Sequence, residues 1–385
     1  MTTNNTTHAE TPIEIAGAGP AGLAAAITLA HAGRQVVVHE THKEVGHRFG
    51  GDFQGLENWT TEEDVLKVLE SLGLTTGFIT MPGRNGTVFD PARNAYEIKS
   101  DEPLFYLIER GPGPGTLDSA LLQQAQSLGV TVHFNSRLRH MAGEGILAAG
   151  PRAADAIAVG YHFETDMENG YWVICDDELA PQGYAYLLVM NGKGTVKSCM
   201  FSGFKQEKIY VKWTVAAFEQ LVGLSMKNPQ PHGGSGNFRI PKSAYSGPHP
   251  QVGEQAGFQD TLWGFGMRLA IHSGVLAAQS LLNGENYDTL WQRALLPQMQ
   301  TAVVNRALFS LLGNRGYGWF LRHQLAKPNL RQLLCRQYQM TPLKRLLGPW
   351  ATRRYGRYES RRKDITCDHI DCHCIWCRGE CCVHG

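Results

Sequence analysis

The stretch Gly17-Ala18-Gly19-Pro20-Ala21-Gly22 follows a short apolar segment at residues 12–16 and opens a run of small residues at 23–32. The first segment predicts a strand and the second a helix, and residues 35–39 predict another strand. Together they form a βαβ unit of about thirty residues, in which a right-handed crossover makes the two strands parallel neighbours.

The three glycines of this turn, Gly17, Gly19 and Gly22, have three different structural roles. They allow unusual dihedral angles, a close approach of the backbone to a pyrophosphate, and tight packing of helix on strand. The helix N-terminus stabilises phosphate charge with its unpaired N–H groups and the positive end of its dipole. The turn therefore predicts a dinucleotide site.

Glu40 ends the second predicted strand, eighteen residues after Gly22. A carboxylate at this place accepts hydrogen bonds from both ribose hydroxyls of an adenosine and repels a 2′-phosphate. The alternative is a glutamate that only caps a structural turn. The context of strand, turn and helix favours the nucleotide site.

A second glycine-rich constellation begins at Gly253-Glu254-Gln255-Ala256-Gly257 and continues with Trp263-Gly264-Phe265-Gly266-Met267 and a helix of small residues. It resembles the motif that follows the substrate domain in the geranylgeranyl reductase and aromatic-hydroxylase branch of flavoproteins. The resemblance implies FAD rather than NAD. It implies that Glu254, where the family more often has Asp, binds the ribityl chain, and that the backbone at Gly253, Gly264, Gly266 and Met267 adjoins the cofactor.

Three further segments are similar to the same family. Glu109-Arg110 resembles the arginine before the second Rossmann helix, and Ala148-Ala149-Gly150 resembles an Ala-Asp-Gly turn. Residues 181–186, Pro-Gln-Gly-Tyr-Ala-Tyr, resemble a substrate-domain motif of the reductases. The resemblance covers residues 12–285 and makes Arg110 a further cofactor residue.

The expected fold class is α/β (α+β): a Rossmann-type FAD-binding domain with an inserted antiparallel β-sheet substrate domain and a helical C-terminal region. The FAD-binding domain is predicted at residues 12–155 and 245–285, and the substrate domain at 156–244. A basic helical region at 286–364 and a Cys/His-rich tail at 365–385 follow. The resemblance implies a flavin between the two domains, facing a largely apolar pocket on the sheet.

Residues 45–52, Val-Gly-His-Arg-Phe-Gly-Gly-Asp, stand where the prenyl reductases usually carry a Cys-Gly-Glu segment beside the flavin, and they contain no cysteine. His47, Arg48 and Asp52 are therefore the catalytic candidates, and Arg48 is expected beside the flavin ring. The leading prediction is a reductase of C=C bonds in an apolar, possibly isoprenoid, small molecule. The alternative is an FAD-dependent monooxygenase or hydroxylase, and the absence of a cysteine from residues 45–52 favours this alternative. The Trp-x-Trp-x-Ile-Pro segment of flavin-dependent halogenases is absent from the sequence.

A second glycine-rich βαβ unit is not evident in the sequence. We therefore expect electrons from NAD(P)H bound transiently, or from a separate electron-donor protein such as a reductase or ferredoxin.

Residues 303–363 hold fourteen Lys or Arg and one acid, Glu359, although the whole chain has a net charge of only +1. Basic residues alternate here with leucines and Trp350, which predicts amphipathic helices that rest on an anionic membrane surface. A solvated helical face is the alternative, and we expect no nucleic-acid partner. The polar first ten residues, and the lack of an apolar run long enough to span a bilayer, favour a cytoplasmic protein, possibly membrane-associated.

The last nineteen residues gather six cysteines and three histidines. Short spacings of thiolates and imidazoles are typical of zinc or another soft metal, and Cys372, Cys374, Cys377 and Cys381 are one possible ligand set. An iron–sulfur cluster, a reduced unliganded tail and lipidated cysteines are the alternatives. A metal-binding or electron-transfer module that uses this tail is the non-enzymatic hypothesis.

Overall fold

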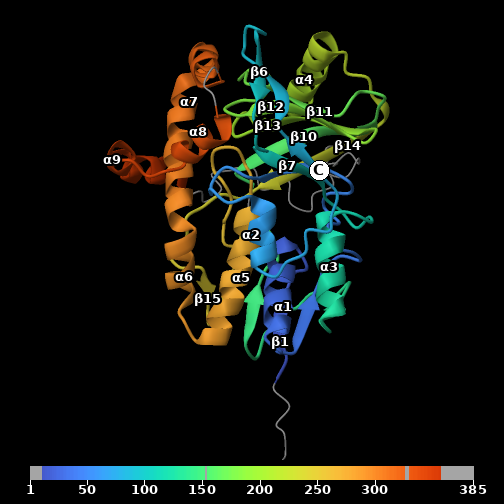
Figure 1. Cartoon of the computed structure of the whole chain (residues 1–385), viewed down its shortest axis with the longest axis vertical. Helices are drawn as coiled ribbons and strands as arrows, with labels where there is room; N and C mark the ends of the chain where they lie inside the picture. The colour runs from blue at the N-terminus through green and yellow to red at the C-terminus, as the bar shows by residue number, and fades with distance from the viewer. Residues whose placement is uncertain (1–10, 152–153, 326–328, 357–385) are drawn as a thin grey trace, which may run out of the picture.

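The structure is a computed structural model that describes residues 11–151, 154–325 and 329–356 (Figure 1). A small parallel sheet with its helices forms one half, at the bottom of Figure 1, and a large sheet forms the other half at the top. The long segment α7 (Leu296–Leu325) runs alongside both halves.

The parallel sheet has four strands in the order β8-β2-β1-β9, namely Thr131–His133, Val36–His39, Ile13–Ala16 and Gly145–Leu147. The register pairs Ile13 with Val36, so the predicted parallel pairing of the first two strands is confirmed. Helices α1 (Pro20–His31) and α3 (Leu117–Ser127) belong to this half. Their leucines, alanines and isoleucines, with Ile13 and Ile15 of β1, form the largest buried cluster.

The large sheet has seven strands in the order β14-β10-β13-β12-β11-β5-β6. They are Lys227–Gly236, Ala156–Glu164, Lys193–Met200, Tyr184–Met190, Gly170–Ile174, Asn85–Phe89 and Ala95–Lys99. Neighbouring strands are antiparallel except β11 and β5, which are parallel, so the sheet is mixed rather than purely antiparallel as predicted. The reason is that β5 and β6 come from residues 85–99, inside the segment assigned to the FAD-binding half.

The two faces of the large sheet differ because side chains alternate along each strand. Val159 and Phe163 of β10 pack toward helix α4 (Glu207–Val222), with Phe218 of that helix in their layer. Gly160 and His162 point to the opposite face, and Lys197 of β13 is paired in register with Gly160. We call this opposite face, which lies toward the parallel-sheet half, the inner face.

A third, antiparallel sheet joins the halves in the order β3-β7-β4, with bounds Phe53–Glu57, Phe105–Glu109 and Thr80–Gly83. The short helix α2 (Val65–Ser71) follows β3. Its N-cap is Asp64, whose carboxylate accepts from the N–H of Leu66, although Thr60-x-x-Glu63 has the pattern of a capping box. Thr60 donates its hydroxyl to Glu57 instead.

After the large sheet the chain returns to the parallel one through β15 (Tyr245–Ser246), β16 (His249–Pro250), the short η1 (Gly253–Gln255) and α5 (Met267–Asn283). A Cβ on Gly274 would lie 2.0 Å from the carbonyl oxygen of Ala21, so glycine lets α5 pack directly on α1. This contact brings residues 253–267 beside the N-terminal glycine turn.

The C-terminal helices are α6 (Tyr287–Ala294), α7, α8 (Leu330–Gln337) and α9 (Pro342–Ala351), followed by a turn of π-helix at Thr352–Gly356. Helix α7 is interrupted at Gly313, where φ is +52°. Within the described ranges, we find no helix whose length and apolarity would suffice to cross a bilayer.

Candidate active site

In the N-terminal glycine turn, two glycines have no room for a side chain, and the third faces open space. A Cβ on Gly17, where φ is +110°, would lie 2.2 Å from the carbonyl oxygen of Ala148, and a Cβ on Gly22 would lie 2.0 Å from the carbonyl oxygen of Gly17. A Cβ on Gly19 would meet no described atom within 4 Å. Gly19 precedes the first residue of α1, Pro20, so the open space lies at the N-terminus of that helix, where backbone amides favour a phosphate.

Glu40 is bound to this turn by backbone hydrogen bonds. The N–H of Ala18 donates to Oε2 at 2.8 Å, and the N–H of His42 donates to Oε1 at 3.0 Å. Each carboxylate oxygen has a second lone pair with which it can accept a ribose hydroxyl. The open glycine, the helix end and the fixed carboxylate therefore fit the adenosine and pyrophosphate parts of FAD.

The second glycine-rich segment lies against α1 and α5. Gly253 has a φ of +58°, its N–H donates to Ser273 Oγ at 2.9 Å, and a Cβ there would lie 3.1 Å from the Cβ of Ala21. Gly266 precedes α5, whose buried first residue is Met267. Gly264, with a φ of +79°, accepts a hydrogen bond at its carbonyl from Gln259. The structure thus places these backbone groups at the N-terminus of α5, as a cofactor contact there requires.

Arg48 joins three parts of the chain at the boundary between the halves. Its Nη1 lies 3.3 Å from Glu254 Oε2, and its Nη2 donates to the carbonyl of Ser235 in β14 at 3.2 Å. Burial raises the pKa of Glu254, although the Arg48 guanidinium opposes that shift. Arg48 and Glu254 are each predicted to lie at the cofactor, and the structure brings them into direct contact.

Arg110 and His47 have other surroundings. Arg110 is buried, makes two hydrogen bonds to Asp118 at 2.8 and 2.9 Å and one to Gln54 at 2.8 Å, and lies over the Phe49 ring. These contacts fix the conformation of residues 46–52. The His47 imidazole is 38% exposed and contacts Glu44, so the structure does not bring it to Arg48 or Asp52.

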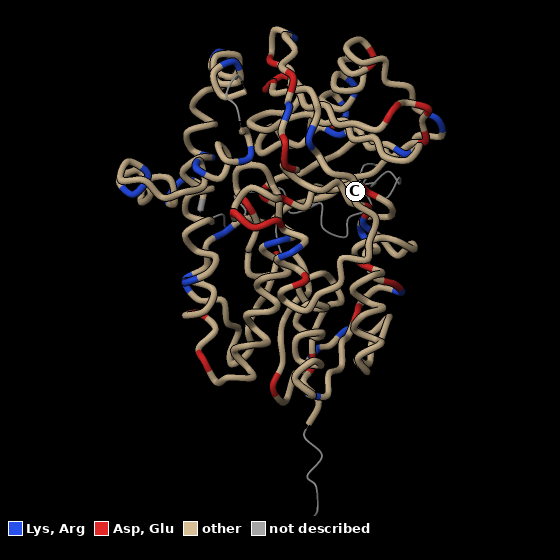
Figure 2. The backbone as a smooth tube through the Cα atoms, in the orientation of Figure 1, with Lys and Arg blue, Asp and Glu red and all other residues tan. Residues whose placement is uncertain are grey.

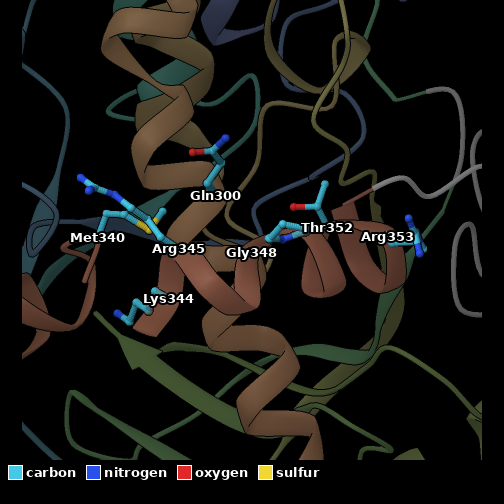
Figure 3. A pocket seen from close by; sticks show the side chains of 8 residues that line it. Gln300, Met340, Lys344, Arg345, Gly348, Thr352 and Arg353 are labelled. Carbon is cyan, nitrogen blue, oxygen red and sulfur yellow. The ribbon is translucent and has the colours of Figure 1, made fainter. Parts of the chain in front are cut away.

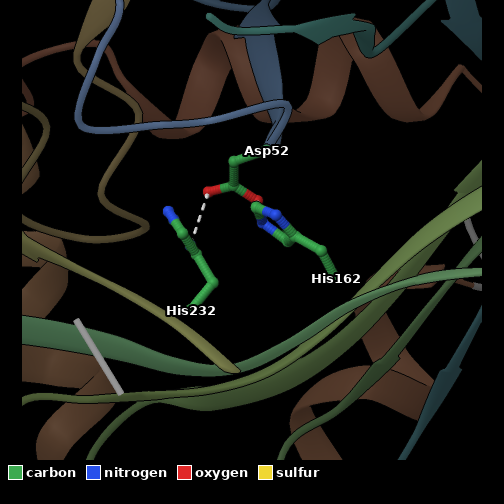
Figure 4. Close-up of side chains that lie close together, drawn as sticks. All are labelled: Asp52, His162 and His232. Atoms are coloured by element: carbon green, nitrogen blue, oxygen red, sulfur yellow. Dashed lines mark hydrogen bonds and ion pairs between the residues drawn. The ribbon is translucent and has the colours of Figure 1, made fainter. Parts of the chain in front are cut away.

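A buried polar cluster lies on the inner face of the large sheet, between Asp52, Lys197, His162 and His232. Figure 4 shows Asp52 and the two histidines of this cluster. Asp52 extends from the loop before β3, and the histidines extend from the sheet. Lys197 Nζ lies 2.6 Å from Asp52 Oδ2 and 2.9 Å from His232 Nδ1, and His162 Nε2 lies 3.0 Å from Asp52 Oδ1. The two imidazoles stack with their centroids 4.1 Å apart.

The partners of His232 define its tautomer. Nε2 lies 3.1 Å from the carbonyl oxygen of Arg48, which can only accept, so Nε2 carries the hydrogen. Nδ1 is then the acceptor for the Lys197 ammonium. Burial, assisted by Lys197, lowers the pKa of His232 to about 3, in agreement with a neutral ring.

Charge in this cluster is balanced by one ion pair. Burial acts to raise the pKa of Asp52, but Lys197, the hydrogen bond from His162 and the other neighbours outweigh it and hold that pKa far below its usual range. Burial and Asp52 raise the pKa of Tyr186, which pairs in register with Lys197. Asp52, His162 and His232 could hold a metal ion by their spacing. The Lys197 ammonium, however, already provides a cation to both Asp52 and His232.

An aromatic cluster adjoins the polar one on the inner face. Trp263 packs against Tyr184 and Phe309 with centroids 5.7 and 5.1 Å apart, and Phe265 packs against Phe105 and Trp59. The prediction of a largely apolar pocket on the sheet is therefore wrong in part. Aromatic side chains form one region of the inner face, and a buried lysine, aspartate and two histidines form the other.

Sequence reasoning identified Asp52 but missed Lys197, His162 and His232. The available signal was Lys197 itself, a charged residue in a strand whose other positions from Gly194 to Met200 are buried. The proposed metal ligands Cys372, Cys374, Cys377 and Cys381 lie outside the described residues, and their metal stays a prediction. In the basic region, Arg306 and Arg331 are buried and donate to backbone carbonyls, so they are structural.

Comparison with known proteins agrees with this geometry. Residues 10–149 match the FAD binding domain family. The digeranylgeranylglycerophospholipid reductase of Haloferax volcanii is 22% identical over 389 residues, which cover 82% of this chain and 90% of that protein.

Two solved structures show the same fold. A geranylgeranyl bacteriochlorophyll reductase-like protein from Thermoplasma acidophilum has a TM-score of 0.67 and 16% identity, with 89% of this chain and 98% of that chain covered. A flavin-dependent brominase has a TM-score of 0.62 and 14% identity, with 89% and 99% covered. The fold is thus shared by reductases and by enzymes of other flavin chemistry. Residues 10–149 form an FAD-binding domain, and the chain is an FAD-dependent oxidoreductase.

Proposed function

We propose that this oxidoreductase reduces C=C bonds in an apolar small molecule such as an isoprenoid. The observation that carries the proposal is the buried Lys197 ammonium, paired with Asp52 and hydrogen-bonded to neutral His232 beside the Arg48–Glu254 pair. Saturation of a double bond needs a hydride at one carbon and a proton at the other. Bound FAD in its reduced form supplies the hydride, and this cluster is the candidate source of the proton.

The residues proposed to hold FAD are those of the two glycine-rich segments. Gly17, Ala18, Gly19 and Glu40 would hold the adenosine and pyrophosphate, and Glu254 with the backbone at Gly264, Gly266 and Met267 would adjoin the rest of the cofactor. Helix α1 begins at Pro20 and Ala21. Gly22 permits close packing of this helix against Gly17, and Gly253 permits close packing against Ala21. Arg48 would orient Glu254, and Arg110 would hold the loop that carries Arg48.

Lys197 is the proposed proton donor, at Nζ. Asp52 keeps the ammonium charged in a buried site, because an opposite charge within hydrogen-bond distance favours the ionised form. His232 accepts one N–H and stays neutral, so it does not compete for the proton. His162 holds the other oxygen of Asp52 in place.

The aromatic cluster supports an apolar substrate. Tyr184, Trp263 and Phe265 present ring surface next to the polar cluster, which would let a hydrocarbon chain lie with a double bond near Lys197. The similarity of 82% of this chain to a digeranylgeranylglycerophospholipid reductase supports the same substrate class.

The test uses purified protein with chemically reduced FAD and a polyprenyl alcohol, without oxygen. We expect the product mass to rise by two hydrogens for each reduced double bond. Lys197→Met should retain FAD and lose this product, whereas Lys193→Met, at an exposed position of the same strand, should make it normally. An unchanged substrate with wild-type protein contradicts the proposal.

The second candidate is a monooxygenase. It is favoured by the absence of cysteine from residues 45–52 and by the polar part of the inner face, which suits a polar aromatic substrate. It predicts that an oxygen atom from O2 enters the product, which mass spectrometry with labelled oxygen detects. NAD(P)H or an electron-donor protein is the proposed source of electrons in either case.

A further inference from the structure

Helix α9 presents an apolar stripe to solvent. Leu343, Leu346 and Trp350 are 63%, 78% and 46% exposed, and their spacing of three and four residues places them on one helical face. The flank of the helix next to this stripe is packed, because Ala351 is buried and Leu347 contacts the cluster around Val303 of α7. In Figure 1 the helix projects sideways from the rest of the molecule.

The same segment carries concentrated positive charge. Residues 342–356 contain Lys344, Arg345, Arg353 and Arg354 and no acid, and Figure 2 shows this blue segment at the edge of the molecule. In the part of the chain that the structure describes, neither Arg345 nor Arg353 has an acidic partner. Lys344 is different, since its Nζ donates to the carbonyls of Gln337 and Gln339 and so ties α9 to the end of α8.

A cavity of about 510 Å³ lies between α7 and α9, on the side of α9 that carries Arg345, Gly348 and Thr352 rather than the stripe (Figure 3). Gln300 of α7 lines one side, and Arg345, Thr352 and Arg353 line the other. Figure 3 shows Arg345 and Arg353 at opposite ends of this cavity, where each guanidinium can bind the oxygens of a phosphodiester with its fork of N–H donors.

We infer that α9 docks this protein on a bilayer of anionic phospholipid. Leu343, Leu346 and Trp350 enter the region between headgroups and acyl chains, and Arg345 and Arg353 bind phosphates of the lipid headgroups beside the helix. An amphipathic helix with Trp and Leu on one face and arginines beside them has the pattern of an interfacial helix. The partner is a lipid surface rather than a protein because cations without acids complement an anionic headgroup layer.

This inference does not depend on the reaction that the flavin performs. Helix α7 links the two sites, because its Arg306 donates to the carbonyl of Leu262 and its Phe309 packs on Trp263. A docked α9 would therefore place the aromatic part of the active site near the membrane surface.

The experiment is co-sedimentation of the full chain, loaded with FAD, with vesicles of phosphatidylcholine alone or mixed with phosphatidylglycerol. We expect binding to the mixed vesicles that weakens with added salt, and much weaker binding to phosphatidylcholine. Arg345→Gln with Arg353→Gln should lower the partition coefficient by about fivefold for each cation. Leu346→Ser with Trp350→Ser should lower it by about tenfold or more.

Matched controls lie on α4, far from α9 in Figure 1. Ile209 and Trp213 are 45% and 49% exposed, and Lys208 and Lys212 are exposed on the same helix. Ile209→Ser with Trp213→Ser, and Lys208→Gln with Lys212→Gln, should bind vesicles as the wild type does. FAD content and the circular dichroism spectrum report whether each variant is folded.

Equal binding of the α9 variants and the wild type, with unchanged fold, overturns the inference. So does equal binding of the wild type to both kinds of vesicle. If the stripe instead joins two copies of the chain, sedimentation velocity will show a dimer that Leu346→Ser with Trp350→Ser converts to a monomer, and vesicle binding will be absent.

Discussion

Lys197 Nζ and Asp52 Oδ2 lie 2.6 Å apart, although 145 positions separate the two residues in the chain. Both side chains are at most 5% exposed. The pair links the loop that carries Arg48 to the inner face of the large sheet. It therefore connects the part of the chain proposed to bind the cofactor with the part proposed to hold the substrate.

Removal of one member of this pair should destabilise the fold. Lys197→Met leaves the Asp52 carboxylate buried without its cation, which typically costs about 3 to 5 kcal/mol in the free energy of unfolding. Adding Asp52→Asn should recover much of that loss, because the uncompensated charge is gone. Urea unfolding of the two single variants and the double variant measures the coupling. Strictly additive losses would show that the two groups do not interact.

Two buried histidines should make the free energy of unfolding decrease as the pH is lowered. Burial lowers the pKa of His232 to about 3 and that of His272 to about 4, below the ordinary 6.5. Between those values and about pH 6.5 the unfolded chain binds protons that the folded chain does not, so the free energy of unfolding decreases as pH falls. His272→Gln should reduce this slope by about 1.4 kcal/mol per pH unit. Parallel stability curves for variant and wild type would rule out a neutral buried His272.

The glycine turn gives a matched pair of substitutions. Gly22→Ala places a Cβ 2.0 Å from the carbonyl of Gly17, so we expect loss of folded protein. Gly19→Ala meets no described atom within 4 Å, and we expect it to fold normally and to lose FAD affinity by about tenfold or more, since its methyl group points into the space proposed for the pyrophosphate.

Gly348→Ala is the control for the turn, because a Cβ there also meets nothing within 4 Å and the residue lies far from the turn, in α9. It should leave both stability and FAD affinity near the wild-type values. Unchanged FAD affinity in a folded Gly19→Ala protein would place the pyrophosphate elsewhere. Fluorescence titration of the protein without bound flavin measures the affinity.

Arg48 and Glu254 should act as a unit in cofactor binding. Arg48→Gln leaves Glu254 buried without the guanidinium that opposes the rise in its pKa, so the carboxyl should become protonated more readily. We expect FAD affinity to fall about tenfold and to become weaker still at acid pH. The double variant with Glu254→Gln should lose this pH dependence. An Arg48→Gln protein with wild-type affinity at every pH would remove Arg48 from the site.

Local sequence patterns were sufficient for the cofactor half. The spacing of Gly17, Gly19 and Gly22, the strand before them and Glu40 after them lie within about thirty residues, where secondary structure alone determines the geometry. The return at Gly253–Met267 was visible because glycines and small residues again precede a helix. The Thr60-x-x-Glu63 pattern does not cap α2, because the Thr60 hydroxyl donates to Glu57, three residues earlier, and Asp64 is the N-cap instead.

The polar cluster could not be predicted in the same way. Lys197, His162 and His232 come from three strands, and only the register of β10 with β13 and β14 brings them to Asp52. One residue of slip in that register would turn each side chain to the α4 face. The addition of β5 and β6 to the large sheet likewise depends on long-range pairing that no local pattern contains.

The most direct test of the proposed C=C reduction is the rate at which reduced enzyme is reoxidised, followed by flavin absorbance in a stopped-flow instrument. We expect that a polyprenyl substrate reoxidises the flavin without oxygen, and that Lys197→Met slows this step while Lys193→Met does not. Reoxidation by oxygen alone, with no effect of the polyprenyl substrate under anaerobic conditions, would contradict it.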